Sequence, residues 1–303
     1  MPNPNGPAET FKSGFTAIIG APNVGKSTLL NTMIGEKVSI VSNKPQTTRN
    51  RIAGVSHRPG FQIVFLDTPG IHKSTKALNS KMVEVAMSAI KDVDLVLMVV
   101  DAANPEPAAE QLILTKLKSS RQPPVILALN KIDLLKKPKL LEIIDRWRTV
   151  YAFSEIVPVS ATEGIQVDEL LDALEKRLPI GPPYFPEDMI TDMPERFIAS
   201  EMIREKVFEL TAREIPFSTA VTIESFEELP KQNLVRIHAA IHVERDSQKG
   251  IIIGNQGAML RAIGEAARLD IEQMLGTRVF LKLFVRVEKN WSRDARALRK
   301  LGY

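Results

Sequence analysis

The chain has 303 residues, of which 44% are apolar and 25% charged, with a formal net charge of +4. This length fits two domains that each bury a core, and this composition excludes wholesale disorder. The absence of cysteine excludes a disulfide scaffold, a thiol nucleophile and a cysteine-ligated metal, and none of the four histidines has HExxH spacing.

The start of the chain predicts no targeting or membrane segment. Residues 1–12 are polar and lack the apolar run of a signal peptide, so we expect a flexible N-terminal tail. The longest apolar run, residues 95–100, is far shorter than the roughly twenty residues of a spanning helix. These observations predict a cytoplasmic protein.

Residues 13–180 alternate short apolar runs with helical patterns, which predicts an α/β domain with a mainly parallel sheet. A hairpin of residues 52–56 and 61–66 makes the sheet mixed at one edge. The other expected strands are 15–20, 94–101, 125–130 and 156–160, and the expected helices are 27–35, 79–91, 107–119, 138–151 and 167–178.

Residues 181–195 are rich in proline, which disfavours helix, and we interpret them as the domain linker. A second domain, residues 196–303, is predicted to have the order α-β-β-α-β, with its helices on one face of a small sheet. Its expected elements are 196–213, 217–227, 234–245, 257–275 and 279–287, followed by a basic closing helix, 291–300. Residues 251–253 are expected to form an apolar turn.

Charge is unevenly distributed along the second domain. Residues 229–303 hold fourteen Lys or Arg against seven Asp or Glu, and residues 181–228 hold four against eleven. Such asymmetry is typical of a face that meets a polyanion. The alternative is a solvated basic surface without a partner.

The first motif fits GxxxxGK[ST] and lies between a predicted strand and a predicted helix. It reads Gly20-Ala21-Pro22-Asn23-Val24-Gly25-Lys26-Ser27, with Thr28 next in the helix. In this motif backbone N–H groups and the helix N-terminus bind phosphate. We expect Lys26 to reach the β- and γ-phosphates and Ser27 to bind Mg²⁺.

Two further motifs follow predicted strands in the order that a guanine-nucleotide site requires. Asp67-Thr68-Pro69-Gly70 places a carboxylate beside the phosphate loop to orient Mg²⁺, and the Gly70 amide would sense the γ-phosphate. Asn130-Lys131-Ile132-Asp133 supplies a carboxylate that accepts both N–H donors of guanine. Ser160 and Ala161, after the last strand, would bind the guanine oxygen through their amides.

At these residues the chain resembles the translation-factor-related class of GTPases. The run Lys44-Pro45-Gln46-Thr47-Thr48-Arg49, followed by the DTPG sequence, is characteristic of Era-type proteins. The resemblance implies a switch I threonine that binds Mg²⁺ when GTP is present. Thr48 is our first choice for this residue and Thr47 the second.

The residue that orients the hydrolytic water is not evident from the sequence. Ile71 stands where many small GTPases have glutamine, and it can neither donate nor accept a hydrogen bond. Related GTPases with asparagine at the position of Asn23 use it to hold K⁺, which would add positive charge near the transferred phosphate. The alternative is that Asn23 only stabilises the loop. His72 is better interpreted as a surface residue than as a base.

The second domain carries a GxxG motif before a predicted helix, Gly254-Asn255-Gln256-Gly257, preceded by Ile253. Such a loop can clamp a nucleic-acid backbone in KH domains, and the surrounding element order matches the type II KH topology. The middle residues are uncharged, so Lys249 and Arg261 are expected to attract the phosphates. The alternative is a turn and helix cap without RNA.

With this domain included, the resemblance to the Era family covers nearly the entire chain. It implies a P-loop GTPase domain followed by an α+β type II KH domain that binds small-subunit (16S) ribosomal RNA near its 3′ end. Implied partners are GTP, GDP, Mg²⁺ and the small ribosomal subunit, whose assembly the protein promotes as a monomer. Peripheral association with the cytoplasmic membrane is left open. The alternatives are a GTPase associated with RNA modification, and an RNA-binding module with a noncatalytic nucleotide site.

Overall fold

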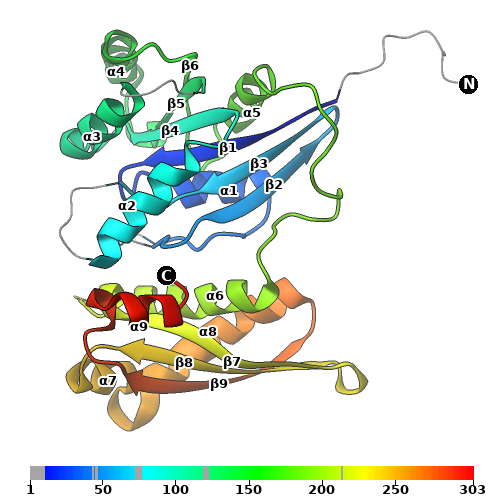
Figure 1. Cartoon of the computed structure of the whole chain (residues 1–303), viewed down its shortest axis with the longest axis vertical. Helices are drawn as coiled ribbons and strands as arrows, with labels where there is room; N and C mark the ends of the chain where they lie inside the picture. Colours follow the sequence, from blue (N-terminus) through cyan, green and yellow to red (C-terminus); the bar gives the residue numbers. More distant parts are fainter. Residues whose placement is uncertain (1–10, 43, 45–46, 72–76, 119–122, 213) are drawn as a thin grey trace, which may run out of the picture. The chain divides into compact units, whose positions relative to one another are not determined.

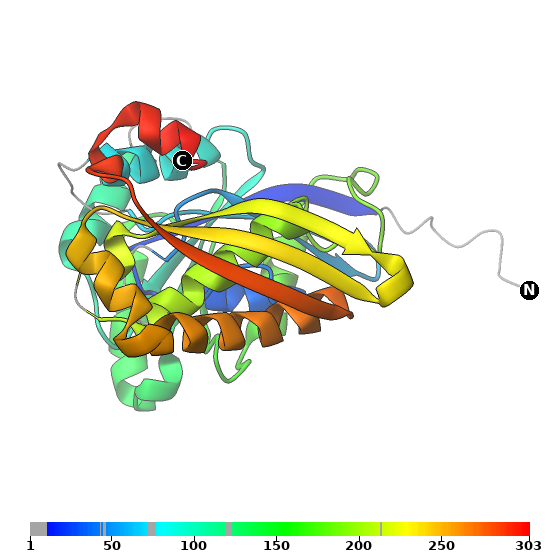
Figure 2. The same cartoon turned by 90° about the horizontal axis from the view of Figure 1, so that it is seen from below.

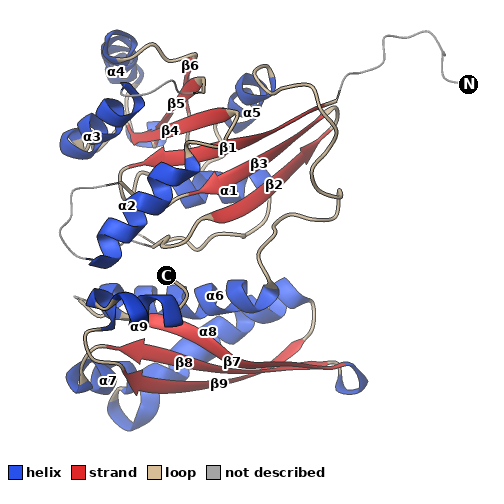
Figure 3. Ribbon diagram, viewed as in Figure 1, coloured by secondary structure: helices blue, strands red, loops and turns tan. Residues whose placement is uncertain are grey.

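The computed structural model describes residues 11–303 except 43, 45–46, 72–76, 119–122 and 213 (Figures 1 and 3). Contacts divide the chain into two units. The first contains residues 1–38, 51–73 and 84–192, and the second contains 39–50, 74–83 and 193–303. The expected domains, 13–180 and 196–303, were continuous, whereas the second unit also takes in two short segments of the N-terminal half.

The first unit is built on a six-stranded sheet with the order β2-β3-β1-β4-β5-β6. Only the β2–β3 pair is antiparallel, so the predicted mixed, mainly parallel sheet is confirmed. The strands are β1 (Lys12–Gly20), β2 (Ile52–Arg58), β3 (Phe61–Asp67), β4 (Leu95–Asp101), β5 (Val125–Asn130) and β6 (Glu155–Pro158).

Helices cover both faces of this sheet, as the apolar strands require. Along β4, Leu95, Leu97 and Val99 belong to one core cluster, and the alternate residues belong to the other. The helices are α1 (Lys26–Ile34), α2 (Ala77–Ala89), α3 (Pro107–Lys118), α4 (Lys137–Val150) and α5 (Val167–Glu175), with a 3₁₀ turn at Ile132–Leu134.

The proline-rich segment after α5 binds the β2 edge of the sheet. The Ile190 carbonyl accepts from the Val55 N–H at 2.8 Å, and the Thr191 hydroxyl donates to the Ala53 carbonyl at 2.6 Å. The Gln62 side-chain oxygen accepts from two further N–H groups of the segment. Residues 181–192 therefore belong to the first unit.

The second unit has a three-stranded sheet with the order β7-β8-β9, in which β7–β8 is antiparallel and β8–β9 parallel. Its elements are α6 (Glu195–Leu210), β7 (Ala220–Leu229), β8 (Leu234–Val243), α7 (Asp246–Ile253), α8 (Ala258–Leu275), β9 (Arg278–Val287) and α9 (Ala295–Lys300), with 3₁₀ turns at Pro216–Ser218, Pro230–Gln232, Asn255–Gly257 and Trp291–Arg293. Helices α6 and α8 pack on one face. Figure 2 looks onto the opposite face, in front of which no helix lies. This arrangement confirms the predicted type II KH topology.

Two expectations for this unit were wrong. Residues 251–253, expected as a turn, end helix α7. Its start is fixed by the Gln248 side chain, which accepts from the N–H groups of Glu244 and Arg245. The expected closing helix 291–300 is interrupted, because the Asp294 carboxylate caps α9 by accepting from the Arg296 N–H at 2.9 Å.

Among the helices of the described residues, none is both long and apolar enough to span a bilayer.

Candidate functional site

The loop between β1 and α1 depends on two glycines. A Cβ on Gly25, whose φ is 94°, would lie 2.3 Å from the Asn130 side-chain nitrogen. A Cβ on Gly20 would lie 2.4 Å from the Val99 carbonyl oxygen. The loop can therefore close over the strand ends only with glycine at both positions.

Lys26 starts α1 and is buried within this loop. Its ammonium donates to the carbonyl of Ala21 at 2.8 Å and to that of Gly20 at 3.4 Å. Burial lowers the pKa of Lys26 to about 8, although the Asp67 carboxylate acts in the opposite direction. The loop thus concentrates positive charge where it opens into the helix N-terminus.

Ser27 and Asp67 form an oxygen pair beside Lys26. The Ser27 hydroxyl donates to Asp67 Oδ2 at 2.7 Å, and Asp67 ends β3 with no solvent exposure. A hydroxyl and a carboxylate are ligands that Mg²⁺ prefers, so these two residues fit the expected ion.

The residues after Asp67 lie against the phosphate loop. Thr68 donates through its hydroxyl to the Ile18 carbonyl at 2.7 Å, and a Cβ on Gly70 would lie 2.7 Å from Pro22 Cα. The Ile71 N–H donates to the Gly20 carbonyl, while the Ile71 side chain is fully buried in the core. Ile71 therefore contributes a backbone hydrogen bond and a core side chain, and it presents no exposed polar group to the nucleotide site. His72 lies outside the described residues.

Asn130, at the end of β5, joins the phosphate loop to the loop after β6. Its side-chain nitrogen donates to the Val24 carbonyl at 2.8 Å, and its side-chain oxygen accepts from the Ala161 N–H at 3.0 Å. The Ser160 hydroxyl donates to Asp133 Oδ1 at 2.5 Å, which orients the carboxylate expected to bind guanine. The structure thus brings together three predicted motifs.

Lys131 links the phosphate loop to Asp101, a residue outside the predicted motifs. Its ammonium donates to the Asn23 carbonyl at 2.8 Å and pairs with the Asp101 carboxylate at 2.6 Å. Asp101 ends β4, as Asp67 ends β3, and this shared position at a strand end is the sequence signal that could have indicated it. Asn23 itself has a positive φ of 63° and an exposed side chain.

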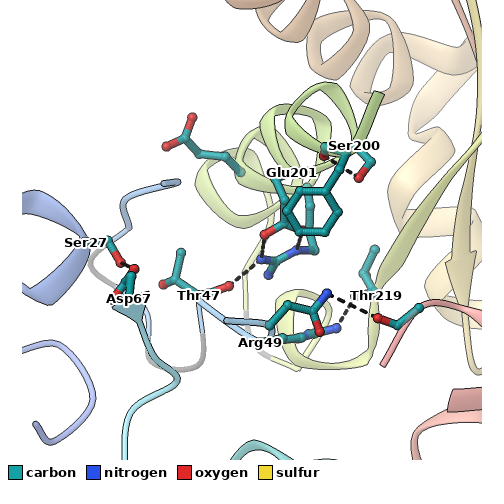
Figure 4. A network of polar contacts seen from close by, with 12 residues as sticks. Ser27, Thr47, Arg49, Asp67, Ser200, Glu201 and Thr219 are labelled. Atoms are coloured by element: carbon teal, nitrogen blue, oxygen red, sulfur yellow. Dashed lines mark hydrogen bonds and ion pairs between the residues drawn. The ribbon is translucent and has the colours of Figure 1, made fainter. Parts of the chain in front are cut away.

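The segment that contains Thr48 packs within the second unit (Figure 4). The buried Arg49 guanidinium donates to the Thr219 carbonyl at 2.7 Å and to the Pro216 carbonyl at 3.1 Å. Burial lowers the pKa of Arg49, with the neighbouring Tyr303 opposing this effect. Thr48 is 6% exposed beside it. Of the same motif, Pro45 and Gln46 lie outside the described residues.

Helix α6 holds this segment from a second side. Arg204, fully buried, donates to the Thr47 carbonyl and pairs with Glu201, while Glu205 accepts from the Val41 N–H at 2.8 Å. Burial opposes the charge of Arg204, but Glu201 outweighs it and raises the Arg204 pKa. Sequence patterns alone did not indicate the contacts to Thr47 and Val41, since these partners are more than 150 residues away from helix α6.

The GxxG loop connects α7 to α8. Gly254 has φ 70° and ψ −179°, and a Cβ there would lie 2.7 Å from Met259 Cβ. Asn255 and Gln256 are exposed. Gly257, directly before α8, has the left-handed conformation.

A groove of about 370 Å³ adjoins this loop. One wall is α8, with Gly257, Arg261 and Arg268, and the other is residues 281–283 of β9. Lys249 and Ile253, also predicted to contact RNA, lie on α7 and are partly exposed. The groove therefore joins the second glycine of the loop to a helix face that carries Arg261, Arg268 and Glu265.

Comparisons with known proteins assign the chain to a family. Residues 15–131 match the model of the 50S ribosome-binding GTPase family, and residues 214–292 match that of the KH domain. GTPase Era of Geobacter metallireducens is 57% identical over 97% of this chain and 98% of its own length. The chain belongs to the GTPase Era family. GTPase Era of Geotalea uraniireducens, at 54% identity, covers the same shares of both chains.

Two solved structures of this family share the whole fold. One is an Era in complex with MgGDPNP and nucleotides 1506–1542 of 16S ribosomal RNA, and the other is a variant of Aquifex aeolicus Era bound to GDP and AlF₄⁻. Each is 42% identical, covers 97% of this chain and 99% of its own, and has a TM-score of 0.93. The protein is therefore a GTPase with a C-terminal KH domain.

Proposed function

We propose that the protein is a GTP-dependent switch that binds 16S ribosomal RNA near its 3′ end and promotes assembly of the small ribosomal subunit. The observation that carries this proposal is the groove of about 370 Å³ beside the GxxG loop, in which Gly254, Gln256 and Gly257 have positive φ angles. The same chain carries a nucleotide site whose motifs are joined by hydrogen bonds. The RNA complex of a 42% identical Era supports the choice of RNA.

In the nucleotide site, Lys26 neutralises the β- and γ-phosphates, and Ser27 and Asp67 hold Mg²⁺. Asp133 accepts from the guanine edge, while Asn130 fixes the loops around it. Thr48 completes the Mg²⁺ ligands in the GTP state. A bound Mg²⁺ supplies charge stabilisation at the transferred phosphoryl group.

The segment that contains Thr48, residues 39–50, couples the nucleotide site to the RNA-binding unit. Its backbone and Arg49 are held by side chains and carbonyls of the second unit. A change of the segment on GTP binding therefore changes the packing of that unit around Arg204. Such order changes around a γ-phosphate are the usual basis of GTPase switching.

The buried Ile71 side chain leaves water orientation to other groups. Asn23 binds K⁺ in our proposal, and this ion adds positive charge beside the transferred phosphate. We also propose that the protein acts as a monomer in the cytoplasm.

The test is RNA crosslinking of the full chain with a nonhydrolysable GTP analogue and with GDP, together with GTP turnover with and without RNA. We expect crosslinks at residues 253–257 in the analogue state, weaker crosslinks with GDP, and turnover that rises with RNA. Equal crosslinks in both states would contradict a switch and favour an RNA-binding module with a noncatalytic site. Chemically altered RNA would favour the modification alternative.

A further inference from the structure

The uncovered face of the second-unit sheet carries two exposed aromatic rings. Of the twelve phenylalanines of the chain, only Phe280 and Phe284 are exposed, at 50% and 37%. Both lie on β9, four residues apart, so they point to the same side of the strand. The intervening odd-numbered residues face the core with α8.

Two further side chains complete this surface, which we call the aromatic face (His238, Phe280, Lys282 and Phe284). His238 lies on β8 opposite Lys282, with its ring 6.4 Å from that of Phe280 and 6.2 Å from that of Phe284. The Lys282 ammonium lies 5.1 Å from the centre of the Phe284 ring. The rings are thus held in place while their outer surfaces stay open.

The charge around the aromatic face is positive. Arg236, Arg278 and Arg286 lie on the same side of the sheet by strand alternation, and two of them pair with Glu227 and Glu224. Among the described residues, no carboxylate lies within ion-pair distance of Lys282. Basic residues therefore outnumber acidic ones around the rings, which fits an anionic partner.

Lys282 also belongs to the groove beside the GxxG loop. Because β9 is an edge strand, one strand separates the groove from the aromatic face. A chain that leaves the groove over this edge meets Lys282 first and the Phe284 ring next.

We propose that the aromatic face is a second RNA subsite, on which bases of the single strand that leaves the GxxG groove stack against Phe280 and Phe284. The inference rests on the proposed RNA binding and extends it beyond the four nucleotides that a KH groove clamps. Exposed rings next to basic side chains are the usual platform for unpaired bases, whereas a protein partner would not require the excess positive charge.

The experiment compares two single-stranded RNAs from the small-subunit 3′ end, of about four and about twelve nucleotides, bound to the full chain with Mg²⁺ and a GTP analogue. The variant Phe280→Leu/Phe284→Leu keeps apolar side chains but removes the rings. We expect it to bind the longer RNA about fivefold or more weaker and the shorter RNA unchanged. Phe280→Tyr/Phe284→Tyr keeps the rings and should bind both like the parent.

A control variant and a check of the fold separate the outcomes. Leu141→Ala removes an apolar side chain that is 63% exposed on α4, and it should change neither affinity. If the leucine variant binds the longer RNA like the parent, the RNA subsite is overturned. If that variant then binds the small ribosomal subunit more weakly although its RNA affinity is unchanged, the aromatic face is assigned to a protein partner. If the parent binds neither RNA, the proposed function fails instead. Thermal unfolding of each variant checks the fold.

Discussion

Asn130 shows how single side chains assemble the nucleotide site. It donates to one loop and accepts from another, so a single amide sets the distance between the phosphate loop and the loop after β6. A buried polar group satisfied at both ends keeps one geometry. Asp133 is positioned in the same manner, by the Ser160 hydroxyl.

Asp133→Asn should change the preferred base from guanine to xanthine. The amide replaces one acceptor by a donor, which suits the additional oxygen of xanthine, and we expect the preference to change about a hundredfold or more. Competition between GTP and xanthosine triphosphate measures it. Ser160→Ala is the control and should weaken the binding of both nucleotides by the same factor. A variant that still prefers GTP would remove Asp133 from base recognition.

The lowered pKa of Lys26 makes nucleotide affinity depend on pH. Between about 8 and 10.5 the nucleotide-free protein loses a proton that the unfolded chain retains. Phosphate oxygens favour the charged form, so binding must take up this proton and affinity should fall as pH rises above 8, by up to about tenfold per unit. Titration calorimetry of GDP with parent and Lys26→Ala isolates the effect, since guanine titrates equally in both. Parallel pH profiles would show that Lys26 stays charged.

Among the elements, the strands were predicted well and the connections of the second unit less well. Continuous apolar runs predict the buried strands, and the GxxxxGK[ST] motif predicts the glycines of the phosphate loop. Helix α7 was missed because Gly250 and three isoleucines disfavour helix, and Gln248 stabilises its start through a contact to Ser218, 30 residues away. The role of Arg49 likewise depends on distant carbonyls that no local pattern shows.

The two glycines of the GxxG loop should respond differently to alanine. Gly254→Ala places a Cβ against Met259 in a backbone region that only glycine favours, and we expect a loss of about 2 kcal/mol or more. A Cβ on Gly257 meets nothing within 4 Å, so only its positive φ adds a cost of about 1 kcal/mol. Urea unfolding of the second unit measures both. Equal losses would mean that the Met259 contact adds nothing.

On the scale of the whole molecule, the Thr48 segment belongs to the GTPase motif by sequence and to the RNA-binding unit by contact. The Arg49 guanidinium lies 5.4–6.0 Å from the ring centres of Phe208, Trp291 and Tyr303. These rings come from helix α6 and from the C-terminal end of the chain. The buried Arg49 guanidinium therefore contacts residues of α6 and residues as distant in sequence as Tyr303.

Arg49→Ala should release this segment without unfolding the second unit. The carbonyls of Thr219 and Pro216 lose their donor, and we expect amide hydrogen exchange over residues 39–42 to quicken about tenfold or more. Mass spectrometry of peptides covering residues 39–50 measures the change. Glu205→Gln is the control, since an amide oxygen still accepts from the Val41 N–H. Unchanged exchange in Arg49→Ala would show that other contacts hold the segment.

Strand β9 has one unpaired edge ten residues long, with two exposed rings beside it. Such an edge is a template on which a second copy of the chain could add a strand. Arg278, Lys282 and Arg286 stand every fourth residue along it, so two copies paired at this edge would bring like charges together. At about 1 M salt, where the Debye length is about 3 Å, this repulsion is screened and self-association should rise. Sedimentation velocity should show dimers at high salt in the parent and already at low salt in Arg278→Gln/Lys282→Gln; a monomer throughout would show that strand shape alone protects the edge. The cations that attract RNA would then also be what keeps the unliganded protein from aggregating.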